Sequence, residues 1–138
     1  MKKFLLVLIT LMMSTPWLQA QSEPFRVVFD VTSDDTVVHQ MVLRWVNGIT
    51  TADPTAEVKV VFYAKALGMV LKDKSIVSED VIKLANRDNV KFEVCEQSLK
   101  RHNLDKSVLL DGVTTVPDAI YEIVALQHEG WGYIKASR

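Results

Sequence analysis

The stretch Val58–Tyr63 (VKVVFY) decides the fold, because it is apolar at every position except Lys59 and the terminal Tyr63 hydroxyl. A strand with one wet face alternates apolar and polar residues, whereas a central parallel strand is covered on both faces and is apolar almost throughout. Two β-rich runs flank it along the chain, Arg26–Val31 (RVVFDV) and Val90–Cys95 (VKFEVC). The sequence therefore predicts a sheet in which these three runs are parallel strands.

Amphipathic helices separate the predicted strands. Residues 36–47 have helical periodicity, with His39 on the solvent side and Gly48 expected to end the helix. The residues expected on the inner side of this helix are Val37, Val38, Met41, Val42, Trp45 and Val46. A helix capped by Ser78 is expected to follow, and then a short one over residues 97–102.

The last part of the chain repeats the pattern. Residues 113–116 and 131–136 are predicted strands, and Pro117 is expected in the first turn of the helix between them. Thr115 and Asp118 have the spacing of a capping box, and the inner stripe expected for this helix is Ala119, Ile120, Ile123, Val124 and Gln127. Strands that alternate with helices in this way predict an α/β fold, a three-layer α/β/α sandwich with a mostly parallel sheet of about five strands.

The first twenty residues have the pattern of a secretory signal peptide. Lys2 and Lys3 precede the apolar run 4–13, and Leu18-Gln19-Ala20 forms a cleavage site of small-residue type. The apolar run is much shorter than the roughly 20 residues of a membrane-spanning helix. We therefore expect residues 1–20 to be a signal peptide, residues 21–138 to be a single periplasmic domain, and no integral membrane segment to remain after cleavage.

Charge and motifs exclude several function classes. Removal of Lys2 and Lys3 leaves 14 Lys and Arg against 17 Asp and Glu, a balance that gives no basic footprint for nucleic acid. The glycine motifs of dinucleotide-binding and P-loop folds are absent from the sequence, so no cofactor is expected. His39, His102 and His128 lack the spacing of a zinc site, so no metal site is expected either.

Cys95 is the only cysteine in the chain and the main candidate for chemistry. It ends a predicted strand and precedes a predicted helix, and in open α/β sheets ligands bind outside the carboxyl ends of the strands. The helix N-terminus would also favour the thiolate, which is the nucleophilic form. The alternative is that Cys95 is a small apolar residue packed at the end of a buried strand.

Four other residues have two interpretations each. Asp30 could face the same crevice as Cys95, but we expect a turn or cap residue at this strand end. Tyr63 could line the crevice or merely finish the sheet. Trp131 and Tyr133 could form a subunit contact, since aromatic residues are enriched at interfaces, or they could be a strand edge packed on the last helix.

Three segments occur in a characteristic order: Phe92–Leu99 (FEVCEQSL), Leu109–Val113 (LLDGV) and Ile123–Lys135 (IVALQHEGWGYIK), with a weaker likeness at Ala66–Leu71 (ALGMVL). Together they resemble the DsrE/DsrF-like family, in particular its exported, single-domain branch. The resemblance covers nearly all of the predicted mature chain. It implies a five-stranded α/β/α domain, assembly into homo-oligomers such as trimers or hexamers, and in some members sulfur transfer through a cysteine persulfide.

Cys95 matches the cysteine position of that branch, so the resemblance assigns a persulfide role to this residue alone. Relatives often carry His-Gly after the second strand, where this chain has Tyr63-Ala64, and no imidazole is expected there. Glu93 and Glu96 flank the thiol and would oppose the thiolate by like-charge repulsion. The basic residues Lys100, Arg101 and His102 would offset this only if they fold back toward the sulfur.

Two functions follow from these observations. In the first, the protein handles sulfur: Cys95 attacks the sulfane sulfur of a donor, holds it as a persulfide and passes it to an acceptor thiol, so a thiol or sulfur-donor protein is a possible partner. In the second, the protein is a non-catalytic oligomeric module that binds a ligand or partner, and Cys95 is a packing residue. One cysteine without a defined base leaves enzyme status open.

Overall fold

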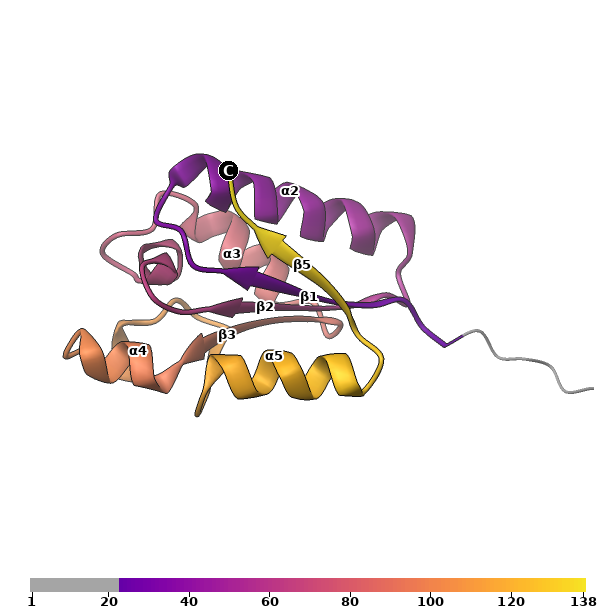
Figure 1. Ribbon diagram of the computed structural model, residues 1–138. Helices are drawn as coiled ribbons and strands as arrows, with labels where there is room; N and C mark the ends of the chain where they lie inside the picture. Colours follow the sequence, from indigo (N-terminus) through magenta and orange to yellow (C-terminus); the bar gives the residue numbers. More distant parts are fainter. Residues whose placement is uncertain (1–22) are drawn as a thin grey trace, which may run out of the picture.

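The computed structural model describes residues 23–138, which form five strands and four α-helices (Figure 1). The predicted signal peptide and its cleavage site lie outside the described residues. The elements in chain order are β1 (Arg26–Val31), α2 (Thr36–Ala52), β2 (Glu57–Phe62), a 3₁₀ helix at Ala66–Met69, α3 (Ser78–Ala85), β3 (Val90–Cys95), α4 (Glu96–Arg101), a 3₁₀ helix at Lys106–Val108, β4 (Val113–Val116), α5 (Ala119–His128) and β5 (Gly132–Ala136).

The five strands form one sheet in the order β4-β3-β2-β1-β5, and every neighbouring pair is parallel. Helices α2 and α3 cover one face of the sheet, and α4 and α5 cover the other (Figure 1). The predicted three-layer α/β/α sandwich with five parallel strands is thus confirmed. The strand order reverses direction at β1, so the switch point of the topology lies between β1 and β5.

The two faces of the sheet differ in how they are buried. The face toward α2 and α3, here the α2–α3 face, carries the main apolar core, in which Phe62 and Phe92 stack with their ring centroids 5.8 Å apart. The face toward α4 and α5, here the α4–α5 face, has a much smaller apolar cluster. Its buried members are Val28, Val61, Cys95, Ala119, Ile123, Leu126 and Trp131. Polar side chains occupy much of the remaining surface of this face.

Helix α2 differs from its sequence prediction in three respects. It continues through Gly48 and ends at Ala52, so the predicted stop at Gly48 is wrong. Val37, expected to be buried, is half exposed because it lies in the first turn, where the Asp35 carboxylate accepts a hydrogen bond from its N–H. His39, expected in solvent, is buried and its ring donates a hydrogen bond to the carbonyl oxygen of Ser33 at 2.9 Å. A buried imidazole is therefore satisfied by backbone.

Two predicted helix starts are also wrong in detail. Val77 precedes α3 as its N-cap and Ser78 is already helical, while the Ser75 hydroxyl accepts a hydrogen bond from the N–H of Val77. In α5 the N-cap is Asp118, whose carboxylate accepts from the N–H of Tyr121, so Pro117 lies before the helix. The Thr115 hydroxyl donates to Glu96 instead of forming a capping box.

The inner side of α5 is rotated relative to the predicted stripe. Ala119, Ile123 and Leu126 are buried, whereas Ile120 and Val124 are 55% and 46% exposed. Tyr121 is the most exposed apolar residue of the helix, at 77%. Among residues 23–138, no helix combines the length and the apolar character that a membrane span requires.

Replacement of Gly48 by alanine tests whether α2 continues through this position. Apart from the chain neighbours of Gly48 and the backbone of the adjacent turns of α2, no atom lies within 4 Å of the Cβ that would be added, and glycine in a helix interior costs about 1 kcal/mol relative to alanine. We therefore expect Gly48→Ala to increase the free energy of unfolding by about 0.5–1 kcal/mol, measured by urea denaturation.

Gly112→Ala is the matched control for this experiment. Gly112 has a φ of +83°, and an added Cβ would lie 2.8 Å from the Cβ of Ala85, so this variant should be destabilised by roughly 1–3 kcal/mol. A loss of stability in Gly48→Ala would contradict the continuous helix.

Candidate functional site

The register of the parallel sheet sets which side chains meet on the α4–α5 face. Lys135, Asp30, Val61, Glu93 and Thr114 are consecutive partners across the five strands, and they form one row on this face. The next row lies toward the carboxyl ends of the strands. Phe62 pairs with Val94, so the residues that follow them, Tyr63 and Cys95, lie side by side in this row. Residues that are far apart in sequence thus gather in two adjacent rows.

Cys95 ends β3 and is the N-cap residue of α4, as the sequence predicted for a strand-to-helix turn. Its side chain makes no capping hydrogen bond. The residue is only 5% exposed and packs in the small apolar cluster of the α4–α5 face. The thiol therefore lies where a site is expected but is covered by its neighbours.

Tyr63 packs against the apolar cluster that contains Cys95. It therefore lines the crevice region, as the first of its two interpretations predicted. Burial and the nearby charge of Asp30 raise the pKa of Tyr63 to about 12. The Lys135 ammonium lies 5.5 Å from the centroid of the Tyr63 ring, within the range of a cation–π contact. Tyr63 is thus a protonated hydroxyl at neutral pH, beside both a cation and the thiol.

Asp30 is not the turn or cap residue that we expected. It is 5% exposed and lies on the same face as Cys95, where it accepts a hydrogen bond from the Tyr133 hydroxyl at 2.7 Å. Lys135 Nζ donates to its other oxygen at 2.8 Å and also to the Thr32 hydroxyl. The hydrogen bond to Asp30, followed by burial, raises the pKa of Tyr133 to about 12. This cluster occupies the switch point between β1 and β5.

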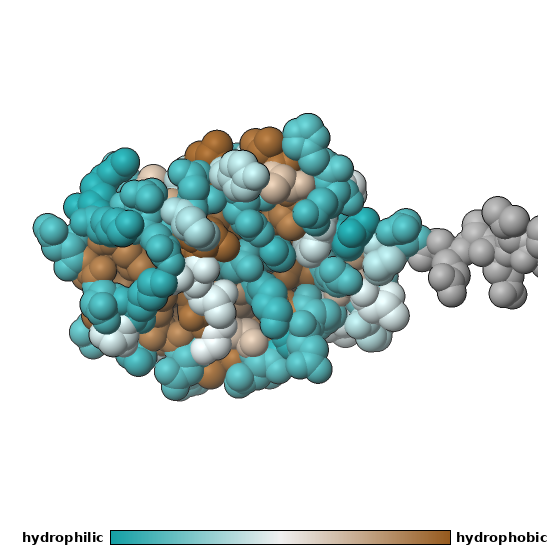
Figure 2. Space-filling model, turned by 90° about the horizontal axis from the view of Figure 1, so that it is seen from below, coloured by the Kyte–Doolittle hydropathy of each residue, from teal (hydrophilic) through white to brown (hydrophobic). Residues whose placement is uncertain are grey.

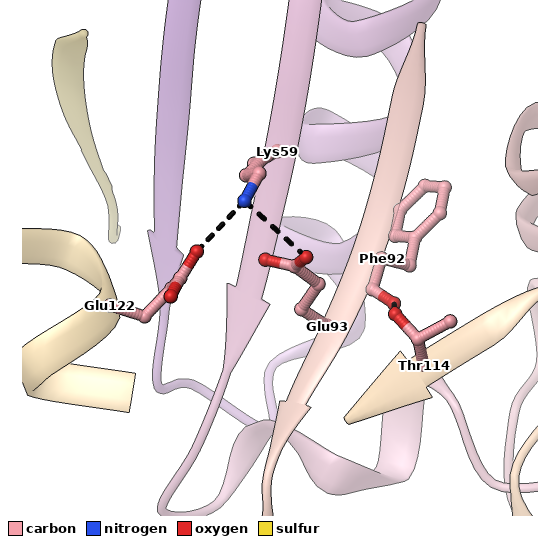
Figure 3. Close-up of polar contacts among 5 residues, drawn as sticks. All are labelled: Lys59, Phe92, Glu93, Thr114 and Glu122. Carbon is pink, nitrogen blue, oxygen red and sulfur yellow. Dashed lines mark hydrogen bonds and ion pairs between the residues drawn. The ribbon is translucent and has the colours of Figure 1, made fainter. Parts of the chain in front are cut away.

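A second charged cluster joins Glu93 of the first row to Lys59, which lies one row toward the amino ends of the strands (Figure 3). Lys59 Nζ is 2.8 Å from Glu122 Oε1 on α5 and 3.5 Å from Glu93 Oε1 on β3. Burial works against the charge of Lys59, but the hydrogen bond with Glu122 and the charge of Glu93 raise its pKa. Burial raises the pKa of Glu93, and within residues 23–138 its Oε2 has no hydrogen-bond partner. Lys59 also lies 5.8 Å from the ring centroid of Trp131.

The charges around Cys95 are arranged differently from the sequence expectation. The Glu96 carboxylate turns to Lys106 and Thr115, and the hydrogen bonds to these residues lower its pKa. Lys100 and Arg101 are exposed in the last turn of α4. The ring Nε2 of His102 donates to the carbonyl oxygen of Ala64 at 3.3 Å.

The loop after β2 is held in an unusual conformation beside this region. Ala64 has a φ of +55°, in the left-handed region that is costly for a residue with a Cβ. Its N–H donates to the Ser98 hydroxyl of α4, and His102 binds its carbonyl oxygen. Contacts from α4 on both sides therefore hold the turn that follows Tyr63.

Trp131 and Tyr133, expected to be either a subunit contact or a packed strand edge, differ in their environments. Trp131, the residue before β5, is 9% exposed and packs in the apolar cluster with residues of α5. Tyr133 is 42% exposed and its hydroxyl binds Asp30. In the described part of the chain, no three His, Cys, Asp or Glu side chains gather so that they could hold a metal ion.

The sequence missed the partners of Asp30. Tyr133 and Lys135 are more than a hundred residues away from Asp30, and only the order of the strands brings β5 beside β1. Alternation of exposed residues along β5 places both on one face, but it does not say which strand they meet.

A family model described as "DsrE/DsrF-like family" matches residues 18–136. A solved structure described as a protein of unknown function, MTH1491 from Methanobacterium thermoautotrophicum, is similar at 31% identity with a TM-score of 0.75. The match covers 80% of this chain and 98% of that one.

Two more distant structures share the fold alone. The ychN protein from E. coli has 11% identity and a TM-score of 0.67, with 80% of this chain and 98% of that chain covered. BT1422 from Bacteroides thetaiotaomicron, a conserved protein of unknown function, has 12% identity and a TM-score of 0.66, with 79% and 92% covered. No curated protein matches the sequence.

Replacement of Glu93 by glutamine tests the charged cluster of Figure 3. A carboxyl whose pKa is raised on folding contributes stability below its unfolded pKa, near 4.3, and this contribution is lost as the pH rises through the folded pKa. In Glu93→Gln this loss disappears, while Lys59 keeps its contact with Glu122. Urea denaturation at a series of pH values from 4 to 8 should therefore show a smaller fall of stability with pH in the variant.

Glu57→Gln is the matched control, since Glu57 is an exposed carboxylate at the start of β2. It should leave the difference between low and neutral pH unchanged. Equal pH profiles for Glu93→Gln and the wild type would contradict a raised pKa at Glu93.

Proposed function

Because the chain belongs to the DsrE/DsrF-like family, we propose that it handles sulfur through Cys95, which carries sulfane sulfur as a persulfide. The observation that supports this most is the place of the chain's only cysteine, at the carboxyl end of β3 beside Tyr63. In open parallel sheets this edge is where ligands bind. We also propose that residues 1–20 direct export and that the domain 21–138 acts in the periplasm.

The proposed transfer conserves electrons and needs no cofactor. The Cys95 thiolate attacks the outer sulfur of a donor persulfide, the bond between the donor's two sulfur atoms breaks, and the electron pair leaves with the donor thiolate. An acceptor thiolate then attacks the outer sulfur of the Cys95 persulfide and restores the Cys95 thiolate. These steps require two partners, a sulfur-donor protein that carries a persulfide and an acceptor thiol.

Tyr63 is suited to assist this chemistry as a positioned hydrogen-bond donor. Its pKa of about 12 keeps the hydroxyl protonated at neutral pH, so it cannot act as a general base there. A protonated hydroxyl stabilises an anion on sulfur, and the Lys135 ammonium above the Tyr63 ring adds positive charge to the same region. Tyr63 and Lys135 thus supply a hydrogen-bond donor and a positive charge at the place where relatives carry the imidazole of a histidine.

A second candidate function rests on the burial of the thiol. At 5% exposure Cys95 is inaccessible to a donor protein unless its neighbours in the apolar cluster move. A buried cysteine with no movement above it is a packing residue. The protein would then be a non-catalytic oligomeric module that binds a ligand or a partner.

We further propose that the protein is a homo-oligomer, a trimer or hexamer, in which α5 meets a second copy of the chain. Ile120, Tyr121 and Val124 expose apolar surface on one helix, and Figure 2 shows hydrophobic residues among hydrophilic ones on this side of the molecule. Exposed apolar patches of this kind are typical of protein interfaces.

The persulfide proposal is tested by intact-mass spectrometry under non-reducing conditions, before and after incubation with inorganic polysulfide. We expect a gain of one sulfur atom that dithiothreitol removes, and no gain in Cys95→Ser. Tyr63→Phe should load more slowly, by roughly tenfold if the hydroxyl makes one charge-assisted hydrogen bond. A Cys95 thiol that gains no sulfur and resists iodoacetamide in the folded state would support the packing role.

Sedimentation velocity tests the assembly proposal. The variant Ile120→Ser with Val124→Ser should shift the protein toward the monomer, because serine removes apolar area from the contact. Ile76→Ser is the control, since Ile76 is 65% exposed outside α5, and it should sediment like the wild type. A monomeric wild-type protein would contradict the proposal.

A further inference from the structure

An apolar groove of about 400 Å³ lies on the α2–α3 face, between α2 and the edge strand β5. The residues that line it are Phe29, Arg44, Trp45, Gly48, Ile49 and Ile134. Trp45 stacks on the buried Phe29 with the ring centroids 6.0 Å apart, which fixes the aromatic wall. Trp45, Ile49 and Ile134 are only partly buried, so their apolar surface is open to solvent along the groove.

Gly48 keeps this groove open. It lies in the interior of α2, where glycine is about 1 kcal/mol less favourable than alanine. Its backbone is helical and does not require glycine, and no other element comes within 4 Å of an added Cβ, so close packing does not require it either. The effect of the missing side chain is space between Trp45 and Ile49.

Arg44 supplies the one charge of the groove. Within residues 23–138 its guanidinium forms no ion pair, whereas Arg26 and Arg138 bind carboxylates and Arg87 donates to Thr50 and Asn47. A guanidinium presents planar paired donors that match a carboxylate. An apolar groove with one such group fits a ligand that has an apolar body and a single anionic head.

We propose that this groove binds a free medium-chain fatty acid, with its carboxylate on Arg44 and its chain along Trp45, Ile49 and Ile134. A flexible aliphatic chain adapts to a groove that is open along one side, and the small volume limits the chain length. Phe29 and Ile134 belong to the α2–α3 face, whereas Cys95 belongs to the opposite face. The site is therefore separate from the proposed sulfur chemistry and does not depend on it.

Isothermal titration calorimetry with decanoate below its critical micelle concentration tests the proposal on the purified protein. Decanoate should bind, octanoate should bind more weakly by up to about fourfold for each methylene group lost, and decyltrimethylammonium should not bind. Cys95→Ser should bind decanoate like the wild type, so a failure of the sulfur proposal leaves this result unchanged.

Two variants test the residues assigned to the site. Gly48→Leu fills the groove without disturbing the helix and should abolish binding, with thermal unfolding as the check that the variant is folded. Arg44→Gln should weaken binding by roughly tenfold, the value of one charge-assisted contact at a partly exposed site. Arg101→Gln, at an exposed arginine on α4, is the matched control and should bind normally.

Three results would overturn the proposal. The first is no binding of decanoate, or equal binding to the wild type and to folded Gly48→Leu. The second is equal binding of decanoate and decyltrimethylammonium, which would remove the role of Arg44. The third is a lower oligomeric state in Gly48→Leu by sedimentation velocity, which would make the groove a contact between copies of the chain. If Gly48→Leu fails to fold, the proposal is tested by the affinity of Arg44→Gln for decanoate and by the comparison of decanoate with octanoate. Equal affinities in both comparisons would overturn it.

Discussion

The constraint on which this structure depends is that a sheet of five parallel strands must be covered on both faces, and the two covering layers are unequal. Helix α2 has 17 residues and is about 25 Å long, enough to span strands of six residues, which measure about 20 Å. Helices α4 and α5 have six and ten residues. The α2–α3 face can therefore be apolar throughout, whereas the α4–α5 face is covered over only part of its area.

Polar residues on the α4–α5 face follow from this imbalance. Asp30, Lys59 and Glu93 occupy strand positions that would be apolar under a full helical layer, and each has an oppositely charged partner. Removing one partner from a buried ion pair is costly, because the remaining charge is left desolvated. The pairs hold α5 and β5 in register with the central strands: Glu122 ties α5 to β2, and Lys135 ties β5 to β1. These ion pairs lie on the α4–α5 face, where apolar packing is less extensive.

The local pattern of the sequence was enough to predict the layers, the parallel strands and the place of Cys95 at the turn after β3. It was not enough where tertiary contacts decide. Gly48 looked like a helix end because glycine is common there, but packing of α2 on the sheet carries the helix past it. His39 looked exposed because it is polar, yet a carbonyl oxygen six residues earlier satisfies its ring. Asp30 looked like a turn residue because its partners lie on β5, at the other end of the chain.

The same imbalance bears on how a buried thiol could take part in transfer. Proteins open locally with free energies that range from near zero to that of global unfolding, and regions with few buried apolar contacts open most easily. The apolar cluster around Cys95 has far fewer members than the core on the other face, so we expect lifting α5 to expose less apolar surface than lifting α2. If the open form is a few per cent of the population, the rate of transfer falls to that fraction of the rate of the open form, a reduction of roughly 20- to 50-fold. Between transfers, the closed form would shield a sulfur anion from solvent and oxidants. Burial of Cys95 is therefore compatible with a carrier, provided that the opening occurs on the α4–α5 face.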